Sequence, residues 1–229
     1  MRWARTRTSW RGAIRARPDA VVIVFARAPR PGRVKSRLVS ALGAAGAARL
    51  HAQMLARAVA TARAAGAGKV ELHCAPDARH PLLRRLARRH GIRLRAQSSG
   101  DLGARMQRAL EAALARADAA VLIGSDCPAL RPSDLRAAFA SLRSGADLVL
   151  VPAEDGGYPL IGLRRVSAAL FERMPWGGPS VLAETRARAA GLGWSIAELR
   201  TLWDVDRPRD LARMKRLKPR IRSANLTFT

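Results

Sequence analysis

The stretch AVVIVFARAPRPGRVKSRL, residues 20–38, joins an apolar run to a basic loop. Residues 20–26 are almost all apolar, which is typical of a strand buried on both faces of a parallel sheet. The loop that follows has prolines and a glycine, which force a turn with accessible backbone N–H groups. It also carries five cations: Arg27, Arg30, Arg33, Lys35 and Arg37. Such a loop can bind phosphate or can be a proline-rich turn with solvated arginines, and it matches neither the Walker A nor the GxGxxG pattern.

Strand-like and helix-like segments alternate along the middle of the chain. Apolar runs of strand length occur at 69–75, 92–96, 119–124 and 146–151. Segments with the helical spacing of apolar residues lie between them. This order predicts βαβ units and a mainly parallel sheet. The runs at 20–26, 119–124 and 146–151 have the continuous apolar character of central parallel strands.

The chain is long enough for one domain with a sizeable core, with 229 residues of which 48% are hydrophobic. After residue 151 the pattern loosens and predicts an antiparallel strand at 158–163, two short helices, a strand near 195–199 and a helix from about Pro208 to Leu217. We expect a single domain over 20–217. A basic, disordered tail at 1–19 and a C-terminal tail at 218–229 would flank it.

The net charge of +25, from 42 Lys+Arg and 17 Asp+Glu, by itself suggests a nucleic-acid binder. We attribute it to a bias toward arginine and alanine, because only four of the cations are lysines. Aromatic residues make up 4%, and no basic stretch is interleaved with aromatics that could stack on bases. Cys74 and Cys127 form neither a disulfide scaffold nor a zinc site. No apolar run reaches the about 18 residues of a membrane span. We therefore expect a cytoplasmic protein with no specific nucleic-acid partner.

The acidic residues are concentrated in short motifs. Six of the 17 fall in four loop-like segments: Asp101, Asp126, Glu154, Asp155, Asp204 and Asp206. Three of these segments directly follow an apolar strand. Ligands of open α/β sheets bind at the carboxyl ends of the strands. We therefore expect these carboxylates on one rim of the sheet.

Two of the motifs have the chemistry of a metal site. Asp126 ends the run LIGSD, and a carboxylate at the end of a central strand is well placed to hold a divalent cation. Mg²⁺ takes one or two carboxylates together with phosphate oxygens. Asp204 and Asp206 lie on the same side of an extended segment, so Asp206 is a candidate for a second metal or diphosphate ligand. The alternative for both Asp126 and Asp206 is a turn or a helix cap.

The other two motifs have candidate substrate contacts. Gly100-Asp101 is a strand-to-helix turn, where Asp101 either caps the helix or contacts a nucleotide. Glu154-Asp155-Gly156-Gly157 places two acids before a pair of glycines that would let a ligand approach the backbone. These acids could bind substrate hydroxyls or act as a base, and the alternative is a plain hairpin turn. The thiol of Cys127 has no histidine within its motif, which favours a small buried side chain.

Taken together, FARAPRPGRVKSRL, GDLGARM, IGSDCPAL, EDGGYPLIGL and DVDRPRDL resemble one bacterial family. This is the radical-SAM/arsenosugar-associated glycosyltransferase-like family of the nucleotide-diphospho-sugar transferase superfamily. More distantly, the motifs are similar to the guanylyltransferases of molybdopterin and coenzyme F420 synthesis. The resemblance spans about residues 20–217. It implies an α/β protein of the GT-A fold, a Rossmann-like three-layer αβα sandwich with a mixed, mostly parallel sheet.

The resemblance also implies roles for individual residues. The nucleotide and its phosphates would contact Ala26, Arg27, Pro31, Gly32, Lys35, Arg37, Gly100 and Asp101. Mg²⁺ or Mn²⁺ would be held by Asp126 and Asp206. The acceptor or sugar side would be formed by Gly156, Gly157 and Tyr158, with Asp155, Glu154 and Lys35 as catalytic groups. The chain departs from the family at Arg27, Ser36 and Pro159, where Lys, Thr and a second Tyr are common.

We expect a metal-dependent glycosyltransferase that uses a nucleotide-diphospho-sugar donor and a small-molecule acceptor. The alternative is a nucleotidyltransferase that moves NMP from an NTP to a small phosphorylated or carboxylated acceptor. The cation-dense first loop favours this alternative, because a triphosphate carries more charge than a nucleotide-sugar. Two readings from other classes, a charge-driven nucleic-acid binder and a scaffold without turnover, are less favoured. The nucleotide base and the oligomeric state stay open.

Overall fold

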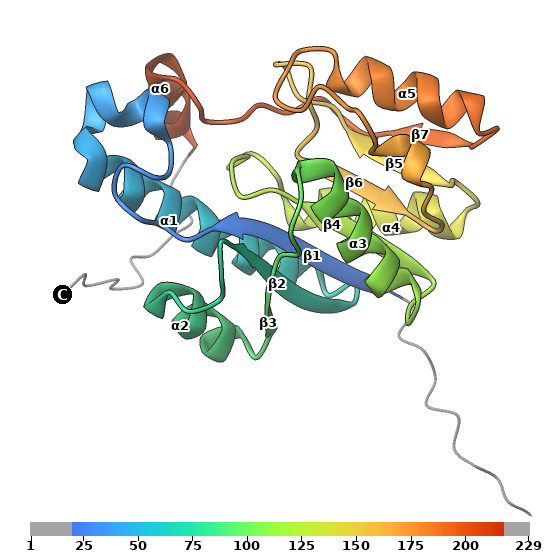
Figure 1. Ribbon diagram of the computed structural model, residues 1–229, viewed down its shortest axis with the longest axis horizontal. Coiled ribbons are helices and arrows are strands. Elements are labelled where there is room, and N and C mark those ends of the chain that lie inside the picture. The colour runs from blue at the N-terminus through green and yellow to red at the C-terminus, as the bar shows by residue number, and fades with distance from the viewer. Residues whose placement is uncertain (1–19, 218–229) are drawn as a thin grey trace, which may run out of the picture.

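The computed structural model describes residues 20–217, and the two expected tails lie outside them. The strands are β1 (Ala20–Arg27), β2 (Lys69–Ala75), β3 (Arg93–Ala96), β4 (Ala119–Ile123), β5 (Leu148–Val151), β6 (Leu160–Leu163) and β7 (Ile196–Glu198). They form one sheet in the order β3-β2-β1-β4-β6-β5-β7 (Figure 1). Neighbouring strands are parallel, except that β6 is antiparallel to both β4 and β5. The expected mixed, mostly parallel sheet is confirmed.

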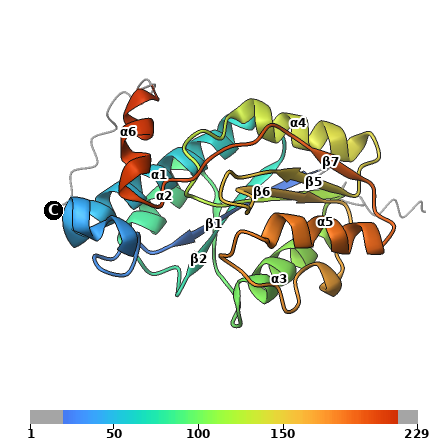
Figure 2. The same ribbon diagram turned by 90° about the horizontal axis from the view of Figure 1, so that it is seen from above.

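Helices cover both faces of the sheet. In residues 20–217 they are α1 (Val39–Ala65), α2 (Pro81–His90), α3 (Leu102–Leu114), α4 (Pro132–Arg143), α5 (Val181–Gly191) and α6 (Pro208–Arg216), with 3-10 turns at Ser36–Leu38 and Ala168–Leu170. One face packs against α1, α2 and α4, and the other against α3 and α5 (Figure 2). This is the expected three-layer α/β fold. None of the helices in the described residues has the length and apolar character that crossing a membrane requires.

β1 explains why the first apolar run is continuous. Val22 and Val24 pack among the residues of α1 and α4, whereas Ile23 and Phe25 pack among those of α3. Successive side chains of a strand point to opposite faces, and here both faces are covered by helices. The strand therefore has no solvent-facing side, and the core consists of one apolar layer on each face of the sheet.

β6 is the antiparallel strand that the sequence predicted at 158–163, and only its place in the strand order was not predicted. The runs at 119–124 and 146–151 become β4 and β5, which run in the same direction, but β6 lies between them. The intervening residues 152–159 turn the chain back so that Leu160 pairs with both Ile123 and Val151. A connection this short is compatible only with antiparallel pairing. The antiparallel strand is therefore confirmed. The runs at 119–124 and 146–151 are parallel to β1 and β7, respectively, but antiparallel to the strand between them.

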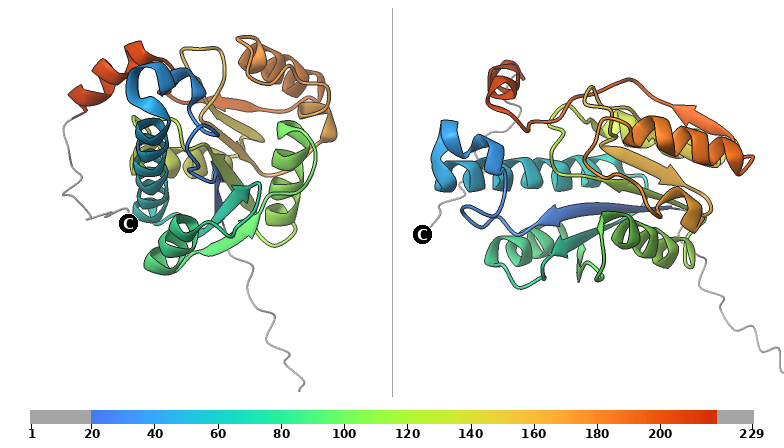
Figure 3. Two further views of the ribbon diagram at one scale, coloured as in Figure 1. Left: turned by 60° about the vertical axis from the view of Figure 1, so that its left-hand side comes forward. Right: turned by 45° about the horizontal axis from the view of Figure 1, so that its top comes forward.

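The last part of the chain returns across the carboxyl ends of β5 and β4. The backbone N–H of Leu202 donates to the carbonyl of Pro152 at 2.8 Å, and that of Glu154 donates to Leu202 at 3.0 Å. The N–H of Val205 donates to the carbonyl of Asp126 at 2.9 Å. α6 then lies beside the beginning of α1 (Figures 1 and 3). These contacts bring the loops after β1, β4 and β5 and the returning segment to one edge of the sheet.

The face of β2 opposite α1 carries a buried glutamate. Glu71 is 2% exposed, and its carboxylate lies 3.1 Å from His73 Nε2, 2.9 Å from Arg116 and 3.3 Å from Arg95. Burial alone raises the pKa of Glu71. The hydrogen bond from His73 and the charges of Arg116 and Arg95 outweigh this and lower that pKa to about 2. The cluster therefore stabilises the ionised form of Glu71.

Replacing Glu71 with Gln should make the free energy of unfolding less dependent on pH in the acid range. The folded-state pKa lies below the ordinary value of 4.5, so the contribution is complete above pH 4.5 and is lost as the pH falls toward 2. This shift corresponds to at most about 3 kcal/mol. Urea unfolding at pH 7 and pH 3 should show a larger loss of unfolding free energy for the wild type than for Glu71→Gln. The exposed Glu111→Gln serves as control, and equal losses in all three proteins would contradict the prediction.

Gly156, in the turn between β5 and β6, packs directly against the segment before α5. Its φ is +86°, and its carbonyl accepts the N–H of Leu182 at 2.8 Å. A Cβ atom at this position would overlap the carbonyl of Pro179. The requirement for glycine here comes from backbone packing as well as from the positive φ.

Gly156→Ala should therefore destabilise the protein more than Gly177→Ala, which is a matched control. Gly177 has nearly the same φ, +84°, but no atom lies within 4 Å of an added Cβ. The φ penalty of about 1 kcal/mol is common to both, and the overlap at Gly156 adds about 1–3 kcal/mol. For a protein of this size each kcal/mol lowers Tm by about 2–4 °C. Equal melting temperatures would show that the turn rearranges freely.

Candidate active site

Lys35 lies between two carboxylates at this edge of the sheet. Its Nζ is 3.0 Å from Asp126 Oδ1 and 2.8 Å from Asp206 Oδ1, and it donates to the carbonyl of Val205 at 2.7 Å. The Lys35 side chain is 4% exposed, whereas those of Asp126 and Asp206 are 41% and 43% exposed. Burial favours the neutral amine, but the two carboxylates outweigh it and raise the pKa of Lys35. The structure thus brings three predicted site residues together, with the carboxylates open to solvent and the ammonium beneath them.

Backbone contacts hold these residues in place. The Val205–Asp126 hydrogen bond fixes the returning segment to the loop after β4. Asp210 caps α6 by accepting the backbone N–H groups of Asp206 and Arg207 at 2.9 and 2.7 Å. The Asp206 side chain is therefore free to face Lys35. The interpretation of Asp206 as a helix cap is excluded by this arrangement.

Asp204 is the most enclosed acid of the site. Its Oδ1 is buried and has no hydrogen-bond partner in the described residues. Burial, together with the nearby charges of Asp126 and Asp155, raises the pKa of Asp204 to about 7. A buried oxygen without a partner is costly, so this atom is a candidate for contact with a bound group.

His51 is a residue of this site that the sequence interpretation missed. It is buried in α1, where its Nε2 lies 3.0 Å from the carbonyl of Arg27 and its Nδ1 is 3.8 Å from Asp126 Oδ1. A carbonyl only accepts hydrogen bonds, so Nε2 carries the proton. Burial lowers the pKa of His51 despite the charge of Asp126. The only sequence signal was a polar residue within the apolar face of a helix.

The remaining cations of the first loop are exposed. Arg30 lies 3.8 Å from Asp77, and Arg37 lies 4.0 Å from Asp206 Oδ2. In the described part of the chain, Arg27 and Arg33 form no ion pair through their side chains. Gly32 takes the turn with a φ of +72°. The loop therefore presents guanidinium groups to solvent next to the paired carboxylates, as a phosphate site would require.

Asp101 caps α3, because its Oδ1 accepts the N–H of Ala104 at 2.8 Å. Gly103, in the same motif, is needed for packing, since an added Cβ would meet the indole of Trp176. Gln97 donates from its amide to the carbonyl of Ala26 at 3.2 Å and so ties this loop to the end of β1. Contacts of Ala26, Pro31, Gly100 and Asp101 with a nucleotide stay predictions.

The EDGG turn is held by its own contacts. Glu154 forms a two-pronged ion pair with Arg213 of α6 at 2.6 and 2.8 Å, and the Arg213 guanidinium lies 4.5 Å from the centre of the Trp203 ring. The hydrogen bonds from Arg213 lower the pKa of Glu154. Asp155 Oδ1 accepts the N–H of Gly157 at 3.0 Å. A catalytic role for either acid stays a prediction.

Tyr158 packs against the core on the side of α3 and α5, and its hydroxyl is buried. Burial raises the pKa of Tyr158 to about 12. Cys127 is buried next to Asp126, and burial raises the pKa of its thiol to about 12, as expected for an inert side chain. The contribution of Tyr158 to substrate binding stays a prediction.

The acids fit a divalent cation that shares its ligands with a substrate. In residues 20–217, no three His, Cys, Asp or Glu side chains are already grouped as a metal site. Asp126 and Asp206 nevertheless both direct an oxygen at the Lys35 ammonium group. Asp204 has a buried oxygen without a hydrogen-bond partner in the described residues. Mg²⁺ commonly takes one or two carboxylates and completes its shell with phosphate and water. The donor set is compatible with that arrangement.

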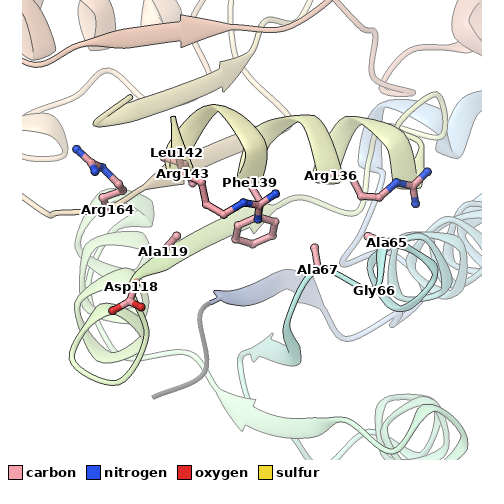
Figure 4. A pocket seen from close by; sticks show the side chains of 10 residues that line it. All are labelled: Ala65, Gly66, Ala67, Asp118, Ala119, Arg136, Phe139, Leu142, Arg143 and Arg164. Carbon is pink, nitrogen blue, oxygen red and sulfur yellow. The ribbon is translucent and has the colours of Figure 1, made fainter. Parts of the chain in front are cut away.

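A cavity of about 550 Å³ lies elsewhere, near the amino end of β4 (Figure 4). Its lining includes Phe139 and Arg143 of α4, together with Asp118 and Ala119 at the amino end of β4. The carboxylates around Lys35 follow the carboxyl ends of the strands. This cavity is therefore not part of the site.

Comparison with known proteins identifies the family. Residues 58–178 match the model of the family described as uncharacterised proteins conserved in bacteria, DUF2064. A relative, the 3-phospho-D-glycerate guanylyltransferase of Phenylobacterium zucineum (strain HLK1), is 34% identical over 189 residues, which cover 80% of this chain and 84% of the relative.

Solved structures share the fold. A proposed nucleotide-diphospho-sugar transferase from Desulfovibrio desulfuricans G20 superimposes with a TM-score of 0.79 at 27% identity and covers 90% of this chain and 91% of its own. Rv0371C of Mycobacterium tuberculosis, crystallised with manganese, has a TM-score of 0.50 at 18% identity over 86% and 97% of the two chains, a likeness of fold alone. The match over 58–178 and the guanylyltransferase relative together show that this chain belongs to the DUF2064 family of bacterial proteins.

Proposed function

We propose that this protein is a metal-dependent nucleotidyltransferase that moves a guanylyl group from GTP to a small phosphorylated acid such as 3-phosphoglycerate. The observation that carries the proposal is the pair Asp126 and Asp206, joined by Lys35, directly beside a loop with four further cations. The guanylyltransferase relative supports the choice of donor and acceptor. This is the alternative of the sequence analysis, and the radical-SAM and arsenosugar association stays a prediction.

In the proposed reaction an acceptor oxygen attacks the α-phosphorus, the bond to the β-phosphate breaks, and pyrophosphate leaves. The first loop would bind the β- and γ-phosphates through Arg27, Arg33 and Arg37 and stabilise the charge of the leaving group. Asp126 and Asp206 would hold Mg²⁺ or Mn²⁺. When bound, that ion neutralises charge on the phosphates.

The ion pair of Glu154 weakens one of the two acids that glycosyl transfer could use as a base. A phosphate or carboxylate acceptor is already ionised at neutral pH and needs no general base. A sugar hydroxyl does need one. Glu154 is engaged by Arg213 in a bidentate ion pair, and the lowered pKa makes it a weaker base.

Glycosyl transfer from a nucleotide-diphospho-sugar is the second candidate. Asp155 has no ion pair in the described part of the chain, so it is accessible as a base for an acceptor hydroxyl. The Desulfovibrio desulfuricans structure, 27% identical, is of a proposed nucleotide-diphospho-sugar transferase. The products of the two reactions differ, because nucleotidyl transfer releases pyrophosphate and glycosyl transfer releases a nucleoside diphosphate.

Incubation of the full chain with GTP, 3-phosphoglycerate and Mg²⁺ or Mn²⁺ should release pyrophosphate. The coupled measurement of pyrophosphate with and without acceptor tests this directly. The same protein with nucleotide-sugars and the acceptor is the parallel reaction. Release of GDP or UDP from a nucleotide-sugar, with no pyrophosphate from GTP, would replace the proposal by the second candidate.

Asp126→Asn should lower the rate of pyrophosphate release by more than about 100-fold, because even residues that only orient metal ligands cost about 10–100-fold when changed. The substitution preserves the shape of the side chain, so the melting temperature should change little. Asp118→Asn, an exposed acid near the amino end of β4, is the matched control and should keep wild-type activity. Full activity of Asp126→Asn would exclude Asp126 as a metal ligand.

A further inference from the structure

Lys35 occupies the point at which the two candidate metal ligands meet. Its ammonium group has three acceptors within 3.0 Å, namely Asp126 Oδ1, Asp206 Oδ1 and the carbonyl of Val205. Two of these contacts are hydrogen bonds, to Val205 and Asp206, and the third is an ion pair with Asp126. The backbone of Lys35 is in the left-handed region, with a φ of +50°, which is uncommon outside glycine. The protein therefore adopts a costly local conformation that places this one charge between two carboxylates.

Lys35 contacts one oxygen of each carboxylate, so a divalent ion bound by Asp126 and Asp206 would lie within a few ångströms of its ammonium group. Two cations within a few ångströms of each other repel strongly in a partly buried site. We propose that Lys35 is an internal cation that holds Asp126 and Asp206 together before the metal binds, and that it leaves this position when the metal enters. This inference rests on the proposed function, because it takes Asp126 and Asp206 as the metal ligands.

The displaced ammonium group of Lys35 would bind a phosphate of the nucleotide. Lys35 is on the same loop as Arg33 and Arg37, which we assign to the phosphates of the nucleotide. Once separated from the carboxylates, Lys35 needs a new anionic partner, and a phosphate oxygen supplies one. Metal entry and phosphate binding would thus be linked, with each favouring the other. Metal alone should bind weakly, because it must displace Lys35 without that compensation.

The test is the affinity for Mn²⁺ alone, without nucleotide. We would measure free Mn²⁺ by electron paramagnetic resonance during titration of the full chain. Lys35→Met should bind Mn²⁺ at least about tenfold more tightly than the wild type, since hydrogen bonds between charged groups that compete with the metal are removed. Arg37→Met is the matched control. It removes one positive charge 4.0 Å from Asp206, but from an exposed side chain, so its effect should be less than about threefold.

A second variant, Lys35→Gly, controls for the possibility that Lys35→Met destabilises the fold. Lys35→Met leaves two carboxylates without their cation, whereas Lys35→Gly in addition relieves the positive φ. Both variants should gain more in melting temperature from Mn²⁺ than the wild type does. If Lys35→Met and Lys35→Gly bind Mn²⁺ no more tightly than Arg37→Met, the inference is wrong while the proposed function stands. If no protein of the series binds Mn²⁺, with or without GTP, both are wrong.

Discussion

The ion pairs of Lys35 with Asp126 and Asp206 are the interactions on which the candidate site depends. They join three segments that are far apart in the sequence, the loop after β1, the loop after β4 and the returning segment before α6. Without a cation between them, the two carboxylates would repel each other at this edge of the sheet. The hydrogen bond from Val205 to Asp126 fixes the distance between the segments, and the ammonium balances their charge. Backbone pairing and electrostatics therefore support the same arrangement.

Ion pairs also fix acidic side chains elsewhere in this chain, which has few acids and many arginines. Glu71 is surrounded by arginines on the face of β2 opposite α1, and Glu154 is paired with Arg213. Asp134, at the start of α4, accepts the N–H of Arg131 and also pairs with Arg200. Each of these acids is engaged by at least one arginine. At the carboxyl ends of the strands, Asp155 and the exposed carboxylate oxygens of Asp126 and Asp206 remain accessible to a substrate.

Much of the fold was predictable because its signals are local. The continuous apolar character of β1 follows from helices on both faces. The turn residues after it gave the position of the basic loop. The antiparallel strand at 158–163 was predicted as well, but its place in the sheet was not, because nothing in residues 146–163 shows whether this strand pairs with one neighbour or inserts between two. That choice depends on which edge of β4 is free, and this is a property of the assembled sheet.

The sequence by itself determined which residue types stand at the ends of the strands, and therefore that a basic loop and several carboxylates would share one rim. Only the tertiary structure decided how these charges combine. It placed Lys35 between Asp126 and Asp206, committed Asp101 and Asp210 to helix caps, engaged Glu154 with Arg213, and brought His51 beneath Asp126. The reason is that caps and turns depend on near neighbours in the chain. The pairing of charges up to 171 residues apart depends on strand order and on the path of the returning segment.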